Sequence, residues 1–166
     1  MIDLTALAVV VEAPEHLVLK RLPLTSPEAD DAVVDIEFSG ISTGTERLLW
    51  TGTMPPFPGM GYPLVPGYES VGRIVEVGAQ SRRRVGERVF VPGALCYGEV
   101  RGLFGGAASR VVVPARRSKN LDNAFAVCSV TLQARAAASG QGNRPASPPS
   151  TFRCRVNRVH FLVLSD

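Results

Sequence analysis

Short apolar runs separated by proline and glycine fill the first 115 residues, and this pattern limits the folds that the chain can adopt. Within residues 32–38 (AVVDIEF), apolar and acidic side chains alternate, as in a half-buried β-strand. Only residues 45–50 (TERLLW) suggest a short helical turn. Many short strands joined by Gly/Pro turns predict a mainly β domain, either a barrel or a sandwich. The other valine-rich runs occur at residues 6–11, 71–77, 85–91 and 109–113.

Basic residues are concentrated at the end of the chain. Residues 116–166 hold eight Lys or Arg and two Asp or Glu, whereas residues 1–115 hold ten and thirteen, so the formal net charge of +3 comes from the final segment. Scattered arginines without a recognisable motif do not predict a nucleic-acid-binding face. Three widely spaced cysteines predict neither a disulfide framework nor a metal-binding pair. No apolar stretch reaches the roughly 18 residues of a membrane span, and no basic flank marks a signal peptide, so we expect a cytoplasmic protein.

The composition changes after residue 115. Residues 116–166 contain Ser, Arg, Ala and Pro in no periodic order and end near an isolated apolar patch, FLVL. Such a segment has little to bury and is expected to be disordered or irregular. Two interpretations stay open: codons read in a shifted frame, or a genuine flexible extension. We therefore predict a folded domain over residues 1–115 and a low-order tail over residues 116–166.

Residues 54–69 (MPPFPGMGYPLVPGYE) form a segment of another kind, with five prolines, three glycines and three aromatic rings. Proline restricts the backbone and glycine permits unusual turns, so the segment is expected to be a stiff loop. One interpretation is a loop that covers a barrel end and fills it with its rings. The other is a binding rim for a flat apolar ligand. Composition alone favours the covering loop.

Three motifs carry a family resemblance. Residues 67–72 (GYESVG), with Gly78 after them, resemble the signature G-H-E-x-x-G-x₅-G of the medium-chain alcohol dehydrogenases, whose histidine binds zinc. Residues 39–46 (SGISTGTE) resemble the S-G-I-C-G-T-D stretch of that family, with Ser42 for the zinc cysteine, one inserted residue and Glu46 for Asp. Residues 105–114 (GGAASRVVVP) resemble its G-G-x-A-x-x-V-V-V-P stretch. The resemblance implies a GroES-like, partly open β-barrel as the catalytic domain.

The zinc sites of that family are altered here. Catalytic zinc requires thiolate, imidazole or carboxylate ligands, and this chain has Ser42 and Tyr68 at two of those positions. Between residues 92 and 105, where zinc members carry a four-cysteine lobe, only Cys96 is present. Because neutral hydroxyls are poor Zn²⁺ ligands, we expect no bound metal.

The loop and its flanking motifs resemble more closely the dehydrogenases of bacteriochlorophyll biosynthesis. This resemblance implies an NAD-dependent oxidation of the ring-A hydroxyethyl group of bacteriochlorophyllide to acetyl, and it allows a homo-oligomer for the full-length protein. It covers about residues 6–115, and we expect it to end near Arg116. Family members continue into a Rossmann domain, but the chain contains no G-x-G-x-x-G. We therefore expect this domain to be absent, and the chain alone neither to bind NAD nor to turn over.

The resemblance also implies roles for individual side chains. A zinc-free alcohol oxidation needs a base or a proton relay, and the candidate catalytic residues are Ser42, Thr45, Tyr68 and Glu69. The candidate pigment-binding residues are Arg47, Trp50, Phe57, Tyr62, Arg101 and Phe104. Tyr68 as a buried ring and Arg101 as a solvated loop residue stay open as alternatives. Two other functions also stay open: a stand-alone pigment-binding module, and an inactive truncated product.

Overall fold

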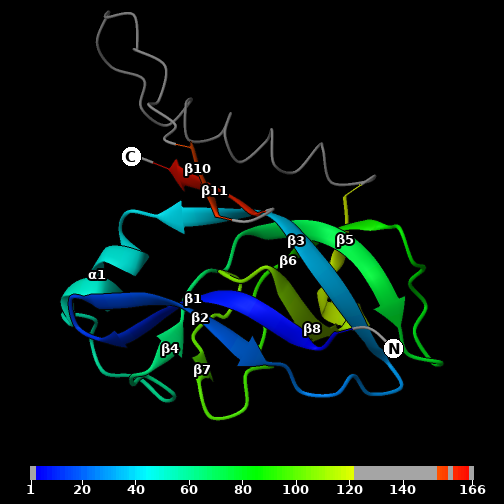
Figure 1. Cartoon of the computed structure of the whole chain (residues 1–166), viewed down its shortest axis with the longest axis horizontal. Helices are drawn as coiled ribbons and strands as arrows, with labels where there is room; N and C mark the ends of the chain where they lie inside the picture. Colours follow the sequence, from blue (N-terminus) through cyan, green and yellow to red (C-terminus); the bar gives the residue numbers. More distant parts are fainter. Residues whose placement is uncertain (1–2, 122–152, 157–158, 165–166) are drawn as a thin grey trace, which may run out of the picture.

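The computed structural model describes residues 3–121, 153–156 and 159–164, whose strands form two sheets with a short helix at one end (Figure 1). The four-stranded sheet contains β1 (Thr5–Ala13), β2 (His16–Pro23), β4 (Leu64–Val65) and β7 (Arg101–Gly102), in the order β2-β1-β4-β7. The second sheet contains β3 (Asp31–Ser42), β5 (Ser70–Val77), β6 (Arg88–Val91), β8 (Arg110–Pro114), β9 (Lys119–Asn120), β10 (Arg153–Val156) and β11 (Val159–Leu164). Helix α1 spans Thr45–Thr51, and the 3-10 helix η1 spans Ala115–Arg117.

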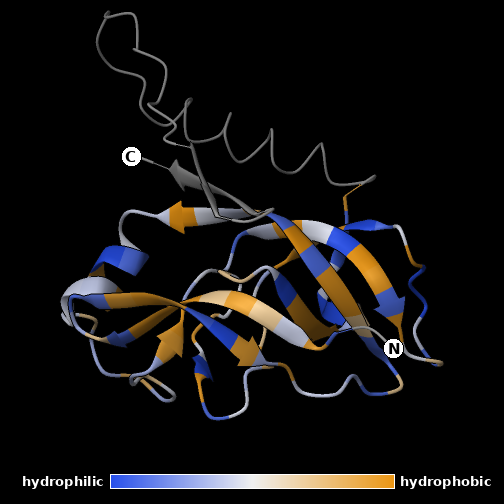
Figure 2. Ribbon diagram, viewed as in Figure 1, coloured by the Kyte–Doolittle hydropathy of each residue, from blue (hydrophilic) through white to orange (hydrophobic). Residues whose placement is uncertain are grey.

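Strand β3 organises the second sheet. It pairs antiparallel with β5 on one side and with β8 on the other, within the order β10-β11-β3-β5-β6-β9. Its alternating sequence buries Val34 and Ile36, while Asp35 between them stays half-buried. The same alternation of apolar and polar residues is visible along β3 and β5 in Figure 2. One face of this sheet therefore faces a core, as the period-two pattern predicts.

Two groups of buried apolar side chains hold the domain together. The larger group joins β1 to β3, β5, β6 and β8. The smaller group contains Val11, Leu49, Leu64 and Leu103, and it attaches α1 to the four-stranded sheet. Leu49 is only 1% exposed, and burial of a leucine contributes about 1.5–3 kcal/mol. This contact fixes α1, and with it the residues at the start of the helix.

The glycines of the G-x-E-x-x-G motif are required by backbone packing. A Cβ on Gly72 would lie 2.1 Å from the backbone oxygen of Asp35, on the neighbouring strand β3. Gly67 has a φ of +96°, and a Cβ there would lie 2.7 Å from the backbone nitrogen of Ala107. Any side chain at these positions would push two backbone segments apart. The glycine spacing therefore belongs to the fold, whatever residue stands at position 68.

The predicted mainly β fold is confirmed. Within the described residues both sheets are open at their ends, which agrees with a partly open barrel. The helical turn expected at residues 45–50 is α1. The same described part of the chain contains no helix long and apolar enough to cross a membrane.

Ordered structure continues past the predicted domain end at residue 115. Strand β9 pairs with β6, and the buried Ser118 donates a hydrogen bond from its Oγ to the oxygen of Ala115 at 2.8 Å. Strands β10 and β11 form a hairpin, and β11 pairs in parallel with residues 38–42 of β3. That edge is open because β8 pairs only with residues 31–35. The disorder expected for residues 122–152 concerns a segment outside the described residues.

Candidate active site

The four predicted catalytic residues meet where β3 ends and α1 begins. Ser42 is the last residue of β3, and Thr45 is the first residue of α1. Tyr68 and Glu69 immediately precede β5, which lies beside β3. The backbone N–H of Gly40 donates to the oxygen of Glu69 at 2.7 Å and continues the pairing of the two segments. Antiparallel pairing thus brings together two motifs that are about 25 residues apart in the sequence.

Hydroxyl groups form the centre of this site. The Tyr68 hydroxyl donates to Thr45 Oγ1 at 3.4 Å, and the backbone N–H of Thr45 lies 3.4 Å from Ser42 Oγ. The Tyr68 ring packs edge-on against Phe104, with 5.2 Å between the ring centroids. Tyr68 is therefore held by a ring contact on its body and by a hydrogen bond at its tip. A hydroxyl both donates and accepts, and in this cluster the hydroxyl groups of Tyr68 and Thr45 are bonded to each other, whereas Ser42 Oγ accepts from the backbone of Thr45.

Glu46 joins this cluster and was not among the predicted catalytic residues. Its Oε2 accepts a 2.9 Å hydrogen bond from the backbone N–H of Ser42. The pKa of Glu46 is raised from its ordinary 4.5 to about 7, chiefly by burial and to a smaller extent by the negative charge of Glu69, against the lowering effect of backbone hydrogen bonds. A carboxyl group with this pKa exchanges protons near neutral pH. The signal in the sequence was its match to the Asp of the family motif.

The residues of this site do not fit a zinc ion. The family's ligand positions hold the hydroxyl groups of Ser42 and Tyr68, which coordinate Zn²⁺ poorly. Among the described residues, no group of three or more His, Cys, Asp or Glu side chains is placed to hold a metal. A chain without zinc stays our prediction.

The described residues do not fit a dinucleotide either. Within residues 3–121, 153–156 and 159–164, α1 is the only α-helix, and it has seven residues. No G-x-G-x-x-G turn precedes it. A dinucleotide pyrophosphate is typically held by such a turn at the start of a longer helix. The described part of the structure therefore offers no cradle for a dinucleotide pyrophosphate.

Two of the predicted pigment-binding residues have packed positions: Tyr62 within the 54–69 loop, and Arg101 of β7 against that loop. The half-buried Tyr62 donates from its hydroxyl to the oxygen of Leu49 at 2.5 Å and packs against the smaller apolar group. Arg101 donates to the oxygen of Tyr62 at 3.2 Å, and its guanidinium lies over Gly61. This part of the loop therefore packs against the smaller apolar group beside the four-stranded sheet.

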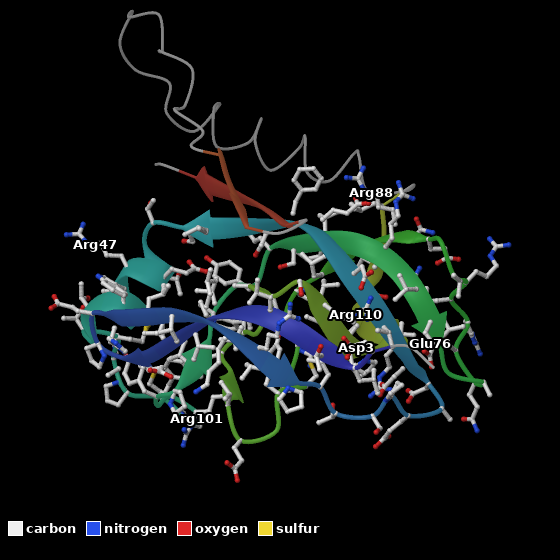
Figure 3. All side chains as sticks on the ribbon, in the orientation of Figure 1. Asp3, Arg47, Glu76, Arg88, Arg101 and Arg110 are labelled. Atoms are coloured by element: carbon white, nitrogen blue, oxygen red, sulfur yellow. The ribbon has the colours of Figure 1, made fainter. Side chains whose placement is uncertain are left out.

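The other candidates are exposed. Trp50, Phe57 and Phe104 are 37%, 38% and 41% exposed. Of these rings, Phe104 contacts Tyr68 directly. Figure 3 shows Arg47 projecting outward from α1 and Arg101 projecting in another direction, from β7. The structure thus brings Phe104 to the hydroxyl cluster and separates the two arginines.

The sequence pattern of a known family covers most of this domain. The model of the alcohol dehydrogenase GroES-like domain matches residues 28–122, more than half of the chain. The chain belongs to this family. The match extends past the predicted boundary at residue 115 and includes both motifs of the site.

Two curated relatives carry the same name, 2-desacetyl-2-hydroxyethyl bacteriochlorophyllide A dehydrogenase. The protein from Cereibacter sphaeroides is 49% identical over 142 residues, covering 80% of this chain and 45% of the relative. The protein from Rhodobacter capsulatus is 50% identical over 140 residues, covering 81% of this chain and 45% of the relative. This chain thus spans less than half the length of these relatives. Both matches are longer than residues 1–115, so similarity continues beyond Arg116, where the motifs alone gave no sign of it.

Solved structures show the same fold. A short chain alcohol dehydrogenase from E. coli CFT073, in complex with NADH, is 27% identical with a TM-score of 0.56, over 70% of this chain and 38% of that chain. A zinc-binding dehydrogenase from Sinorhizobium meliloti 1021, bound to NADP, is 25% identical with a TM-score of 0.53, over 70% and 38%. In both cases the similarity covers the domain that this chain represents.

Proposed function

We propose that this chain is the substrate half of a dehydrogenase of bacteriochlorophyll biosynthesis, which oxidises the ring-A hydroxyethyl group of bacteriochlorophyllide to acetyl. The observation that carries this proposal is the identity of 49–50%, over about 80% of the chain, to two relatives named for a hydroxyethyl bacteriochlorophyllide. Such an enzyme belongs to photosynthetic metabolism. A cytoplasmic location and a homo-oligomeric full-length form stay predictions.

NAD⁺ is the oxidant in this proposal, and it accepts the hydride from the alcohol carbon. It would be held by the part of the protein that this chain does not span, since the relatives are more than twice as long as the match. The NADH bound to the E. coli relative supports this assignment. The described residues would act on the substrate and on its hydroxyl proton.

The hydroxyl cluster takes the role that zinc has elsewhere in the family. Tyr68 would polarise the alcohol oxygen, and Thr45 or Ser42 would pass its proton on, since Tyr68 and Thr45 are already hydrogen-bonded at 3.4 Å. Glu69, whose backbone pairs with Gly40, would hold this segment in place. General acid–base catalysis of this kind contributes about 10²–10⁴-fold to a rate.

The pigment is a broad apolar disc, which requires exposed flat side chains. Trp50, Phe57 and Phe104 meet this requirement. Arg47 lies three residues before Trp50 on α1, and residues at this spacing share one face of a helix. Arg47 would therefore bind the propionate of a pigment stacked on Trp50. Tyr62 and Arg101 would support the 54–69 loop through their hydrogen bonds to Leu49 and Tyr62.

The test uses a chimaera in which residues 1–121 replace the matching part of the Rhodobacter capsulatus relative. With NAD⁺ and hydroxyethyl bacteriochlorophyllide, it should form NADH and acetyl pigment in equal amounts. The intact relative is the positive control, and ethanol and butanediol serve as competing substrates. Oxidation of the small alcohols without the pigment would overturn the proposal. Tight pigment binding by the 166-residue chain, with no oxidation by the chimaera, would instead support a stand-alone binding module.

A further inference from the structure

Residues 93–105, which we call the Phe104 loop, follow β6 and carry Phe104 to the candidate site. The backbone N–H of Ala94, near the start of this loop, donates to the oxygen of Phe104 at 2.7 Å. Next to Phe104, the backbone N–H of Gly105 donates to the oxygen of Val65 on β4 at 2.9 Å. Strand β7, which lies within the loop, also pairs with β4 (Figure 1). The backbone of Phe104 is therefore held both by the start of its own loop and by β4.

Tyr97 closes the same loop with its side chain. It is only 3% exposed, and its ring belongs to the larger apolar group. Its hydroxyl donates a hydrogen bond to the backbone oxygen of Gly105, the residue after Phe104. Burial raises the pKa of Tyr97 well above its ordinary value, so the hydroxyl keeps its proton and stays a donor. The hydroxyl cluster of the candidate site does not include this buried group.

The chain is anchored next to Tyr97. The backbone N–H of Thr25 donates to the oxygen of Cys96 at 2.9 Å, and the Cys96 Sγ accepts from the backbone N–H of Val112 at 3.4 Å. Burial raises the pKa of the Cys96 thiol to about 11, so this group stays neutral in the core. Tyr97 therefore extends from a fixed point toward the end of the loop.

The start and the end of the Phe104 loop are in close contact. A Cβ on Gly105, whose φ is +80°, would lie 2.0 Å from the backbone oxygen of Ala94, and a Cβ on Gly102 would lie 2.1 Å from the same oxygen. Glycine at both positions lets the two backbone segments approach each other. Backbone hydrogen bonds survive most substitutions, whereas the bond from Tyr97 is lost with a single oxygen atom.

Phe104 presents its ring to the site. The ring is 41% exposed and packs edge-on against Tyr68, with 5.2 Å between the ring centroids. The preceding residue, Leu103, is buried in the smaller apolar group. A ring on a fixed backbone loses little conformational freedom when a flat ligand stacks on it, so the ligand binds more tightly than it would to a mobile loop.

We propose that Tyr97 is a positioning residue of the substrate site: its hydrogen bond to Gly105 holds Phe104 against Tyr68 and thereby sets the affinity of the site for a flat aromatic substrate. The inference rests on the proposed function and assigns a residue outside the predicted catalytic and pigment-binding sets. Tyr97 acts through Phe104 and does not touch the reacting atoms. Its loss should therefore change substrate binding more than the chemical step.

Three variants separate this role from a contribution to stability alone. Tyr97→Phe removes the hydroxyl and keeps the buried ring. Ser118→Ala is the matched control, because Ser118 is also buried and its hydroxyl donates to a backbone oxygen, that of Ala115, at 2.8 Å. Phe104→Ala removes the exposed ring, and it tests the proposal even where Tyr97→Phe fails to fold.

The first measurement compares KM and kcat for the pigment in the chimaera. Tyr97→Phe should raise KM about five- to tenfold, the effect of one lost hydrogen bond, and leave kcat within about threefold. Phe104→Ala should raise KM at least as much, and Tyr97→Phe added to it should raise KM no further, because both changes act through the same ring. Ser118→Ala should leave both constants unchanged. An unchanged KM in Phe104→Ala or in a folded Tyr97→Phe would overturn the proposal, and so would additive effects of the two changes.

The second measurement is independent of turnover and uses the 166-residue chain itself. Nuclear Overhauser contacts between the ring protons of Phe104 and Tyr68 should be present in the parent and in Ser118→Ala, and weakened in Tyr97→Phe. Parent-like contacts in a folded Tyr97→Phe would overturn the proposal even if the chimaera oxidises the pigment. Weakened contacts in Tyr97→Phe, with a chimaera that does not oxidise the pigment, would overturn the proposed substrate instead.

Discussion

The Tyr68 hydroxyl donates a hydrogen bond to Thr45 Oγ1 across the end of β3, at 3.4 Å. The two residues belong to different sequence motifs, and the pairing of β3 with β5 brings them together. A tyrosine at position 68, where the family has a zinc-binding histidine, thus links the two motifs through its hydroxyl group.

The variant Tyr68→Phe should separate the contribution of the Tyr68 hydroxyl group from that of its ring. The ring contact with Phe104 is kept, so the thermal midpoint should stay within a few degrees of the parent. Activity in the chimaera should fall by about 10²-fold, mainly in kcat, because the group that polarises the alcohol is lost. Steady-state kinetics and a melting curve on the same sample provide the check. Unchanged kcat would remove Tyr68 from the mechanism.

Gly72→Ala tests whether the motif glycines serve the fold. The added Cβ would lie 2.1 Å from the Asp35 oxygen, so β3 and β5 must separate locally. We expect a loss of about 3 kcal/mol or more in the free energy of unfolding, measured with urea. Gly44→Ala is the matched control, since its Cβ would meet no atom closer than Ser42 Oγ at 3.9 Å and its φ is −76°. Equal stability of the two variants would contradict this explanation.

Glu46 should also make stability depend on pH. Its pKa is about 7 in the folded chain against an ordinary 4.5, so the folded state binds the proton more tightly than the unfolded state. The resulting stabilisation is complete below about pH 4.5 and is lost as pH rises through 7. The free energy of unfolding of the parent should therefore decrease from pH 5 to pH 8 relative to Glu46→Gln. Parallel urea curves for the two proteins at both pH values would exclude a raised pKa.

Sequence patterns predict most of the strands, because in these strands the apolar residues of the alternating pattern are the ones that are buried. The run at 32–38 lies within β3, and the runs at 71–77 and 109–113 lie within or overlap β5 and β8. Strand β2 gave no such signal. Among the described strands it lies at the edge of its sheet and pairs with β1 alone. Leu17 and Leu19 on it are about half exposed, so no regular pattern of burial is imposed on its sequence.

The residue types at the candidate site could be predicted from the sequence, but the raised pKa of Glu46 could not. The motifs point to Ser42, Thr45, Tyr68 and Glu69 because those residues occupy or flank positions that a zinc site would use. The pKa of Glu46 depends on its burial by the surrounding fold and on a carboxylate 23 residues away. Neither the burial of Glu46 nor its proximity to Glu69 can be inferred from the residues next to it in the sequence. The same is true of Tyr62 and Arg101, whose hydrogen bonds depend on the path of the loop.

The purified chain should contain no stoichiometric zinc. The ligand positions carry the hydroxyl groups of Ser42 and Tyr68, which are poor ligands for Zn²⁺. Elemental analysis after dialysis against a chelator is the measurement. Ser42→Cys combined with Tyr68→His is the matched comparison, because it supplies a thiolate and an imidazole and should retain more zinc. About one zinc per parent chain would contradict the prediction.

The 166-residue chain should bind the pigment but not NAD⁺, and it should not turn over. Hydride transfer requires the nicotinamide to be held over the substrate carbon, and a misplacement of about 1 Å can lower the rate by about 10²-fold. The described residues present no glycine-rich turn at a long helix to hold the pyrophosphate. Exposed rings at Trp50, Phe57 and Phe104 would still stack on a chlorin.

Two calorimetric titrations on one sample, with pigment and with NAD⁺, make the comparison. Trp50→Ala should weaken pigment binding, with Leu95→Ala, at another exposed apolar site, as the control. Micromolar NAD⁺ binding by the parent chain would show that the nucleotide site lies within these 166 residues.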